Sequence, residues 1–121
     1  MNMAENSNTL LPEGRRTSPV ILILKGEDKP IPLTEGKHTI GCGDVDIVIG
    51  ENDKFVSDHQ STLTVEKDLL GEWALYLQDT PNTVNLTRIN GEACKDEFNY
   101  RLYEGDNIRM GMTYLSVHFD V

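Results

Sequence analysis

The chain has 121 residues, of which 20 are Asp or Glu and 11 are Lys or Arg, and its net charge is −9. This length corresponds to one domain, large enough to bury a hydrophobic core without metal or disulfide cross-links. The negative charge repels phosphate backbones and anionic lipids, so we expect neither nucleic acid nor a membrane as a direct partner.

The N-terminal part of the chain differs in composition from the rest. Residues 1–18 are polar and rich in turn-forming residues, which predicts a flexible arm followed by a domain over residues 19–121. The longest apolar run, residues 20–24, is a predicted strand and is too short to span a membrane. No charged segment followed by an apolar one precedes this run, so we expect an intracellular protein.

Short segments with a period of two follow, separated by turn signals. Residues 37–41 and 46–50 are predicted strands joined by a tight glycine turn. Residues 61–66, 72–79 and 113–121 alternate apolar and polar side chains, as half-buried strands do. No segment keeps a helical period over three turns, so the sequence predicts an all-β sandwich.

Four segments occur in an order that is more specific than any one of them. They read TIGCGDVDIVI, VSDHQSTLTV, DTPNTVNLTRING and LYEGDNIRMG. With this order the chain resembles the forkhead-associated (FHA) domain over roughly residues 20–120. That family is a β-sandwich of two twisted, mainly antiparallel sheets, and loops at one end of it bind phosphothreonine peptides. The resemblance implies an FHA-like sandwich with a peptide-binding loop end.

The resemblance also assigns individual positions in these loops. Gly41 matches the glycine of the first turn, where a Cβ would interfere, and Ser57 matches the serine of the second loop. Asn85 and Thr87 match the asparagine and threonine of the third loop, and Asn90 matches the asparagine of the next asparagine–glycine pair. The predicted, vestigial phosphopeptide-binding residues are therefore Cys42, Ser57, Asp58, Asn85, Thr87 and Asn90.

Cys42 occupies the position from which the family's arginine reaches the phosphate. An arginine supplies a planar fork of donors and a permanent charge, whereas a thiol supplies neither. Losing one charge-assisted bond of roughly 1.5–3 kcal/mol weakens binding by about ten- to a hundredfold. Asp58, next to the serine, is unfavourable beside a phosphate, so the sequence predicts that phosphothreonine binding is lost or weak.

Structural roles compete with ligand contact at several of these positions. Gln60 stands where the family has a histidine, and we expect its amide to hydrogen-bond the loop backbone. Asn85 and Asn90 are expected to brace their loops more than to contact a ligand, because Asn–Gly is a common hairpin turn. Ser57 and His59 are too close in sequence to form a nucleophile–base pair without a third partner, so we expect no catalysis.

Neither a metal nor a cofactor is expected. Cys42 and Cys94 lack metal-ligand spacing, and one pair of cysteines is no disulfide framework. The acidic residues in segments 43–46 and 51–54 lack the length and terminal glutamate of a calcium loop, so we interpret them as solvated turns.

Two functions remain open at this point. The preferred one is a non-catalytic protein–protein interaction module that has lost phosphothreonine binding and acts in homodimerisation or assembly of a nuclear DNA-damage or chromatin signalling protein. A resemblance to the mediator-of-DNA-damage-checkpoint family, in placement and texture, implies the homodimer and the nucleus, and Tyr114 and His118 on the last strand would supply a contact face. The alternative is a phosphothreonine-peptide reader with weakened affinity. Either way the partner is a second copy, another protein or a peptide.

Overall fold

The computed structural model describes residues 16–120, which form eleven β-strands and contain no helix that could cross a membrane. The arm expected over residues 1–18 lies outside the described residues as far as residue 15, and the first strand begins at Thr17. The strands are β1 (Thr17–Leu24), β2 (Lys29–Thr34), β3 (Gly36–Gly41), β4 (Ile47–Val48), β5 (Ser61–Lys67), β6 (Trp73–Asp79), β7 (Arg88–Ile89), β8 (Glu92–Ala93), β9 (Tyr100–Leu102), β10 (Asn107–Met110) and β11 (Thr113–Phe119).

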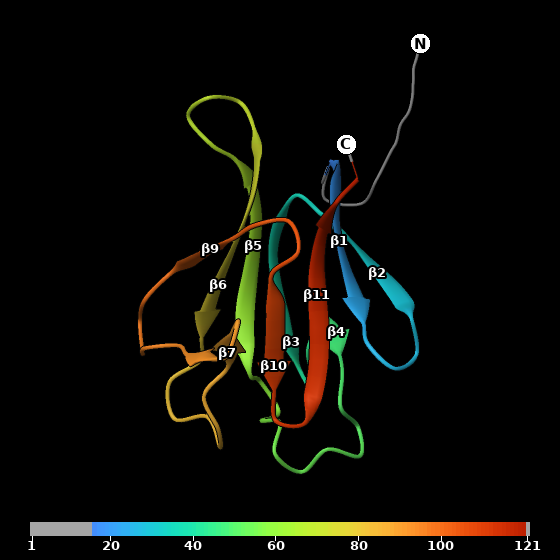
Figure 1. Cartoon of the computed structure of the whole chain (residues 1–121). Helices are drawn as coiled ribbons and strands as arrows, with labels where there is room; N and C mark the ends of the chain where they lie inside the picture. The colour runs from blue at the N-terminus through green and yellow to red at the C-terminus, as the bar shows by residue number, and fades with distance from the viewer. Residues whose placement is uncertain (1–15, 121) are drawn as a thin grey trace.

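The strands form two sheets. One has the order β2-β1-β11-β10-β7-β8, and the other has the order β4-β3-β5-β6-β9. The first and last long strands, β1 and β11, lie side by side in the first sheet (Figure 1). The β3–β4 pair is parallel, and the other registered pairs are antiparallel. The expected all-β sandwich of two mainly antiparallel sheets is confirmed.

Two local expectations differ from the structure. The segment 46–50 contributes only the two residues of β4, which run parallel to β3 instead of returning through a tight turn. The Asp46 carboxylate accepts the backbone N–H of Thr39 at 2.9 Å, so a side chain takes a position that a hairpin partner would fill. Strand β2, which contains Pro30 and Pro32, has no alternating signal, and it is tolerated because it forms the edge of its sheet.

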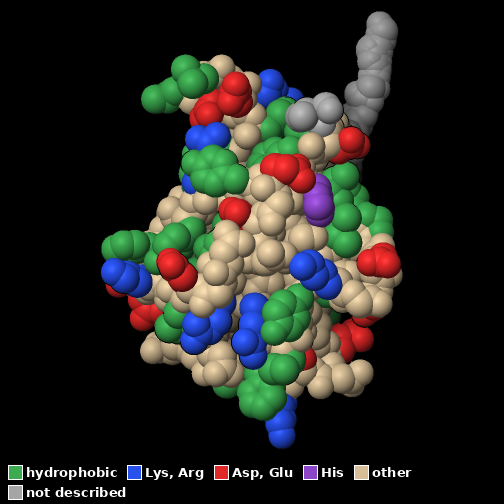
Figure 2. Space-filling model, viewed as in Figure 1, with side chains coloured by type: hydrophobic (Ala, Val, Ile, Leu, Met, Phe, Trp, Pro, Cys, Tyr) green, Lys and Arg blue, Asp and Glu red, His purple; other side chains and the backbone are tan. Residues whose placement is uncertain are grey.

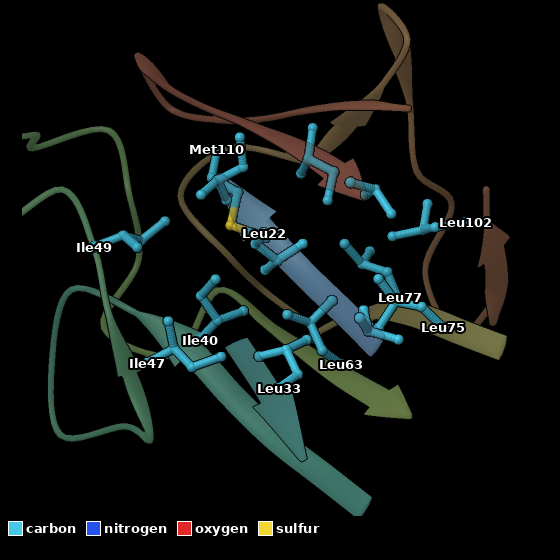
Figure 3. Packing of buried hydrophobic residues seen from close by; sticks show 14 of the residues in the cluster. Leu22, Leu33, Ile40, Ile47, Ile49, Leu63, Leu75, Leu77, Leu102 and Met110 are labelled. Atoms are coloured by element: carbon cyan, nitrogen blue, oxygen red, sulfur yellow. The ribbon is translucent and has the colours of Figure 1, made fainter. Parts of the chain in front are cut away.

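The core lies between the two sheets, where the inward side chains of each sheet meet. Leu22 and Met110 come from the six-stranded sheet, while Ile40, Leu63 and Leu77 come from the five-stranded one, and all five are fully buried. Figure 3 shows these side chains pointing toward one another. The predicted alternation thus places one face of each long strand in a single core and leaves the other face at the surface.

Candidate functional site

Three loops meet at the end of the sandwich where β3 ends and β5 begins. They are segments 42–46, 49–60 and 80–87, at the end opposite to the start of β1 and the end of β11 (Figure 1). The loops surround a cavity of about 520 Å³. Its lining residues are Cys42, Glu51, Asn52, Asp53, Lys54, Val56, Ser57, Asp58 and Val84. Three of the predicted residues, Cys42, Ser57 and Asp58, therefore share one cavity.

Two glycines let the β3–β4 loop approach the loop that precedes β5. A Cβ at Gly41 would lie 2.2 Å from the Asp58 carbonyl oxygen, and one at Gly43 would lie 2.7 Å from the Asp58 Cβ. This close approach allows the backbone N–H groups of Cys42 and Gly43 to donate to the carbonyls of Ser57 and Asp58, at 3.1 and 3.0 Å. The expectation that a side chain at position 41 would interfere is confirmed, and the obstacle is the backbone of the neighbouring loop.

The Cys42 thiol is directed at acceptors inside the protein. Its Sγ lies 3.2 Å from the Val56 carbonyl oxygen and 3.5 Å from Oδ1 of Asp58. Burial, followed by the hydrogen bond to Asp58 and the charge of that carboxylate, raises the pKa of Cys42 above its ordinary value. The thiol is therefore neutral at physiological pH, and it holds the Asp58 carboxylate beside the cavity.

Ser57 and Lys54 supply donors to the same cavity. The Ser57 hydroxyl oxygen accepts the backbone N–H of Val84 at 2.6 Å, and within residues 16–120 its own proton has no acceptor. Lys54 is the one cationic side chain in the lining, and its Nζ lies 5.6 Å from the centroid of the Phe55 ring. A ligand oxygen in the cavity would thus meet a free hydroxyl donor and an ammonium group.

The buried Gln60 side chain connects two of the three loops, segments 49–60 and 80–87, by hydrogen bonds. It is fully buried, its Oε1 accepts the backbone N–H of Ser57 at 2.9 Å, and its Nε2 donates to the carbonyl of Asn85 at 2.8 Å and to Oγ1 of Thr87 at 3.0 Å. The Asn85 amide continues this connection by donating to the Phe55 carbonyl at 3.2 Å. The expected structural role of Gln60 is confirmed.

Thr87 belongs to a buried polar network and not to the cavity. It is fully buried, its N–H donates to Oδ2 of Asp79 at 2.8 Å, and its hydroxyl lies 3.0 Å from that of Ser61. The Ser61 hydroxyl donates to the other Asp79 oxygen at 2.6 Å. Burial, with the charge of Asp79, raises the pKa of the adjacent Cys94 to about 12. Thr87 has no surface to offer a ligand, and its role is to fix the loop.

Asn90 also braces a turn away from the cavity. Asn90 and Gly91 have φ of 51° and 90°, the left-handed conformation of a two-residue hairpin turn between β7 and β8. The Asn90 amide donates to Asp106 at 3.0 Å, and its oxygen accepts the N–H of Asn107 at 2.9 Å. The structure thus fixes the β7–β8 hairpin against the start of β10.

The cavity remains acidic despite Lys54. Glu51, Asp53 and Asp58 line it as well, against that single cation. Asp53 is held within the protein, because its Oδ2 accepts the N–H of Met112 at 2.6 Å and the hydroxyl of Thr113 at 2.8 Å. All three carboxylates would oppose an anionic ligand, and these bonds fix the position of Asp53.

The part of the chain that contains these loops matches the model of a known protein family. The model of the FHA domain matches residues 38–111, from β3 to the turn between β10 and β11. The chain belongs to the FHA domain family. FHA domains are protein-interaction modules, and the three loops described above lie within the matched residues. The comparison with curated proteins finds no match.

Solved structures, several of them of FHA domains, share this sandwich. The FhaA FHA domain complexed with the intracellular domain of Rv3910 is 26% identical, with a TM-score of 0.68 over 82% of this chain and 99% of that chain. The Slr1951 protein from Synechocystis sp. is 28% identical, with a TM-score of 0.67 over 83% of this chain and 97% of that chain. The N-terminal FHA domain of Rad53p from S. cerevisiae, in complex with a phosphothreonine peptide, is 21% identical and shows the fold alone, with a TM-score of 0.69 over 83% and 92% of the two chains.

Lys54 is the FHA cavity residue that the sequence interpretation missed. Segment 51–54 was interpreted as a solvated turn, yet Asp53 in it anchors to the β10–β11 turn and places Lys54 on the cavity. The available signal was its position three residues before Ser57, which puts a cation within the same loop.

Proposed function

We propose that the chain is a non-catalytic FHA module that binds a phosphothreonine peptide at its loop end, with an affinity lowered by Cys42. The observation that carries this proposal is that Ser57 and Lys54 line the same cavity as Cys42. A phosphoryl group there would accept a hydrogen bond from the free Ser57 hydroxyl and would be attracted by the Lys54 ammonium. The buried Gln60 fixes the backbone that carries Ser57 by accepting its N–H.

The expected loss of affinity follows from what each side chain supplies. An arginine at position 42 would add a two-pronged, charged donor, worth about ten- to a hundredfold in binding. Lys54 restores a point charge without the planar fork, and Asp58 and Glu51 oppose the ligand. A phosphothreonine reader weaker than one with arginine is the expected result.

A second candidate is favoured by the carboxylates of the cavity. If Asp58 and Glu51 outweigh Lys54, phosphothreonine binding is lost and the scaffold serves homodimerisation or assembly. The role in a nuclear DNA-damage or chromatin signalling protein belongs to this candidate and rests on the resemblance to the mediator-of-DNA-damage-checkpoint family.

Binding to a degenerate phosphothreonine peptide library, with an unphosphorylated library as reference, tests the first candidate. Cys42→Arg should raise the affinity about ten- to a hundredfold, whereas Ser57→Ala and Lys54→Gln should each lower it. Lys37→Gln, at an exposed position at the other end of β3, is the matched control and should change nothing. If neither the native chain nor Cys42→Arg prefers the phosphorylated library while sedimentation reports a dimer, the second candidate holds.

A further inference from the structure

Two arginines face each other across neighbouring strands on the outer surface of the six-stranded sheet. Arg88 of β7 and Arg109 of β10 are direct cross-strand partners. The next pair, Ile89 and Ile108, points into the sandwich, where Ile108 is fully buried, so the arginines point outward. Like charges placed directly opposite each other on a sheet are destabilising unless something lies between or beside them to compensate.

No carboxylate of residues 16–120 compensates these two charges by an ion pair. Arg88 donates to the Gly91 carbonyl at 3.0 Å. Arg109 donates to the Gly111 carbonyl at 2.8 Å and to the Met112 sulfur at 3.4 Å. Each guanidinium keeps further N–H donors without an acceptor among residues 16–120.

The acidic group whose charge interacts with Arg109, Asp53, is engaged elsewhere. Asp53 carries a charge that acts on Arg109, but its oxygens accept hydrogen bonds from Thr113 and from the N–H groups of Phe55 and Met112. Asp53 therefore fixes the loop beside the arginines and leaves their outward donors open. An anion that binds them must come from outside the described part of the chain.

A groove of about 860 Å³ runs past both arginines. None of the described Asp or Glu residues lines it, while several of its apolar lining residues are exposed. Those side chains are Phe55, Val84, Leu86, Met112 and Tyr114. Figure 2 shows Lys and Arg side chains next to hydrophobic ones on this face, over β7, β10 and β11. Charge and exposed apolar surface together are the pattern of a protein-binding surface.

The groove is built on fixed elements. Arg109 lies over the Tyr114 ring at 5.6 Å, and Arg88 is held by the β7–β8 hairpin, whose Asn90 is bonded to Asp106 and Asn107. Side chains held in this way lose little freedom on binding, so their donors are ready for a ligand.

We propose that this groove binds an acidic segment of a partner protein, with one carboxylate or phosphoryl group between Arg88 and Arg109 and a neighbouring apolar side chain against Phe55 and Leu86. Charge complementarity carries this choice of occupant, because two planar guanidinium groups in a lining free of carboxylates suit a bidentate anion. The groove contains neither Cys42 nor Ser57, but it adjoins their cavity, because Val84 lines both and Asn85 lines the groove. The two arginines lie outside the phosphothreonine cavity, so their substitution tests the groove separately.

Screening an array of random unmodified dodecapeptides, with a second array carrying phosphoserine, tests the proposal. The native chain should enrich peptides with Asp, Glu or phosphoserine beside an aromatic or aliphatic residue, and the two arrays separate carboxylate from phosphoryl ligands. For the enriched peptides, Arg88→Gln and Arg109→Gln should each weaken binding about tenfold or more. Lys37→Gln, at an exposed position at the far end of β3, should leave it unchanged.

Three results would overturn the proposal. The first is that no peptide on either array gives a binding signal 100-fold above background. The second is that the enriched peptides contain neither acidic residues nor phosphoserine. The third is that the enriched peptides still bind after both arginine substitutions. Sedimentation of the native chain and the R88Q/R109Q variant is the further check: a dimer that dissociates in the variant would make a second copy the occupant and would also overturn it. Both arginines are at the surface, so thermal melting should show that the variants remain folded.

Discussion

The replacement of Gln60 by alanine should destabilise the whole domain, although Gln60 lies beneath the candidate site and contacts no ligand. The change removes three hydrogen bonds, which join Oε1 to the Ser57 N–H and Nε2 to the Asn85 carbonyl and to Thr87 Oγ1. Thr87 keeps a hydroxyl partner in Ser61, and the Asn85 carbonyl keeps the Thr83 hydroxyl at 3.1 Å. The Ser57 N–H loses its partner beneath the loops.

The magnitude follows from those losses. A typical hydrogen bond contributes about 1 kcal/mol net, and each buried group left without a partner costs about 1–3 kcal/mol. With part of this relieved by water entering the loops, we expect a loss of roughly 2–4 kcal/mol in the free energy of unfolding. For a domain of this size the melting temperature would fall by on the order of 10–25 °C.

Chemical denaturation of Gln60→Ala beside two other variants measures this effect. Gln60→Met keeps most of the volume and should lose nearly as much stability, which separates hydrogen bonding from cavity formation. Gln78→Ala is the matched control, because that glutamine is exposed on β6. Equal stability of the Gln60 and Gln78 variants, within about 0.5 kcal/mol, would refute the reasoning.

Three further predictions concern the loops and the titratable groups. Gly41→Ala should unfold the domain or lower its melting temperature far more than Gly71→Ala does. The reason is that a Cβ at position 41 meets backbone at 2.2 Å, while nothing lies within 4 Å of a Cβ at position 71. Equal shifts in circular dichroism melts of the two variants would contradict this. Cys94, with its pKa raised to about 12 by burial and by Asp79, should resist iodoacetamide until the protein unfolds, and mass spectrometry that finds it alkylated in the native state would contradict this. For Asp53, burial opposes ionisation, but hydrogen bonds from Thr113 and from the Phe55 and Met112 N–H groups hold its pKa below the ordinary value. The ionised carboxylate therefore stabilises the fold above about pH 4, and this contribution is lost as the pH falls through the lowered pKa. Asp53→Asn should therefore show a smaller drop in melting temperature between pH 6 and pH 3 than the native chain, and an equal drop would count against it.

The long strands were predictable because their signal is local. The period-two segments that became β5, β6 and β11 each bury one face, and the Asn90–Gly91 turn carries its conformation in its own residue types. Strand β2 was missed because proline is compatible with an edge strand, and only the sheet order shows that β2 is an edge. The parallel β4 was missed because a side-chain bond from Asp46 replaces a hairpin partner.

The site was predictable only where one loop sufficed to define it. Ser57 and the role of Gln60 follow from a short motif, whereas Lys54 reaches the cavity because Asp53 is tied to Met112, 59 residues later in the chain. The pairing of Arg88 with Arg109 depends on β7 lying beside β10, which are not neighbours in the sequence. Contacts of this range have no periodic or compositional signal in the sequence.

The burial of the polar network explains how the loops keep their arrangement with a cysteine at position 42. Gln60, Thr87 and Asp79, which hold the loops in place, are at most 2% exposed, whereas Cys42 and Ser57 are only partly buried at the cavity. Substitution of Cys42 removes its bonds to Val56 and Asp58 but leaves the buried network of Gln60, Thr87 and Asp79 in place. Since that network holds the loops without Cys42, Cys42→Arg should shift peptide affinity while the melting temperature changes by no more than a few degrees.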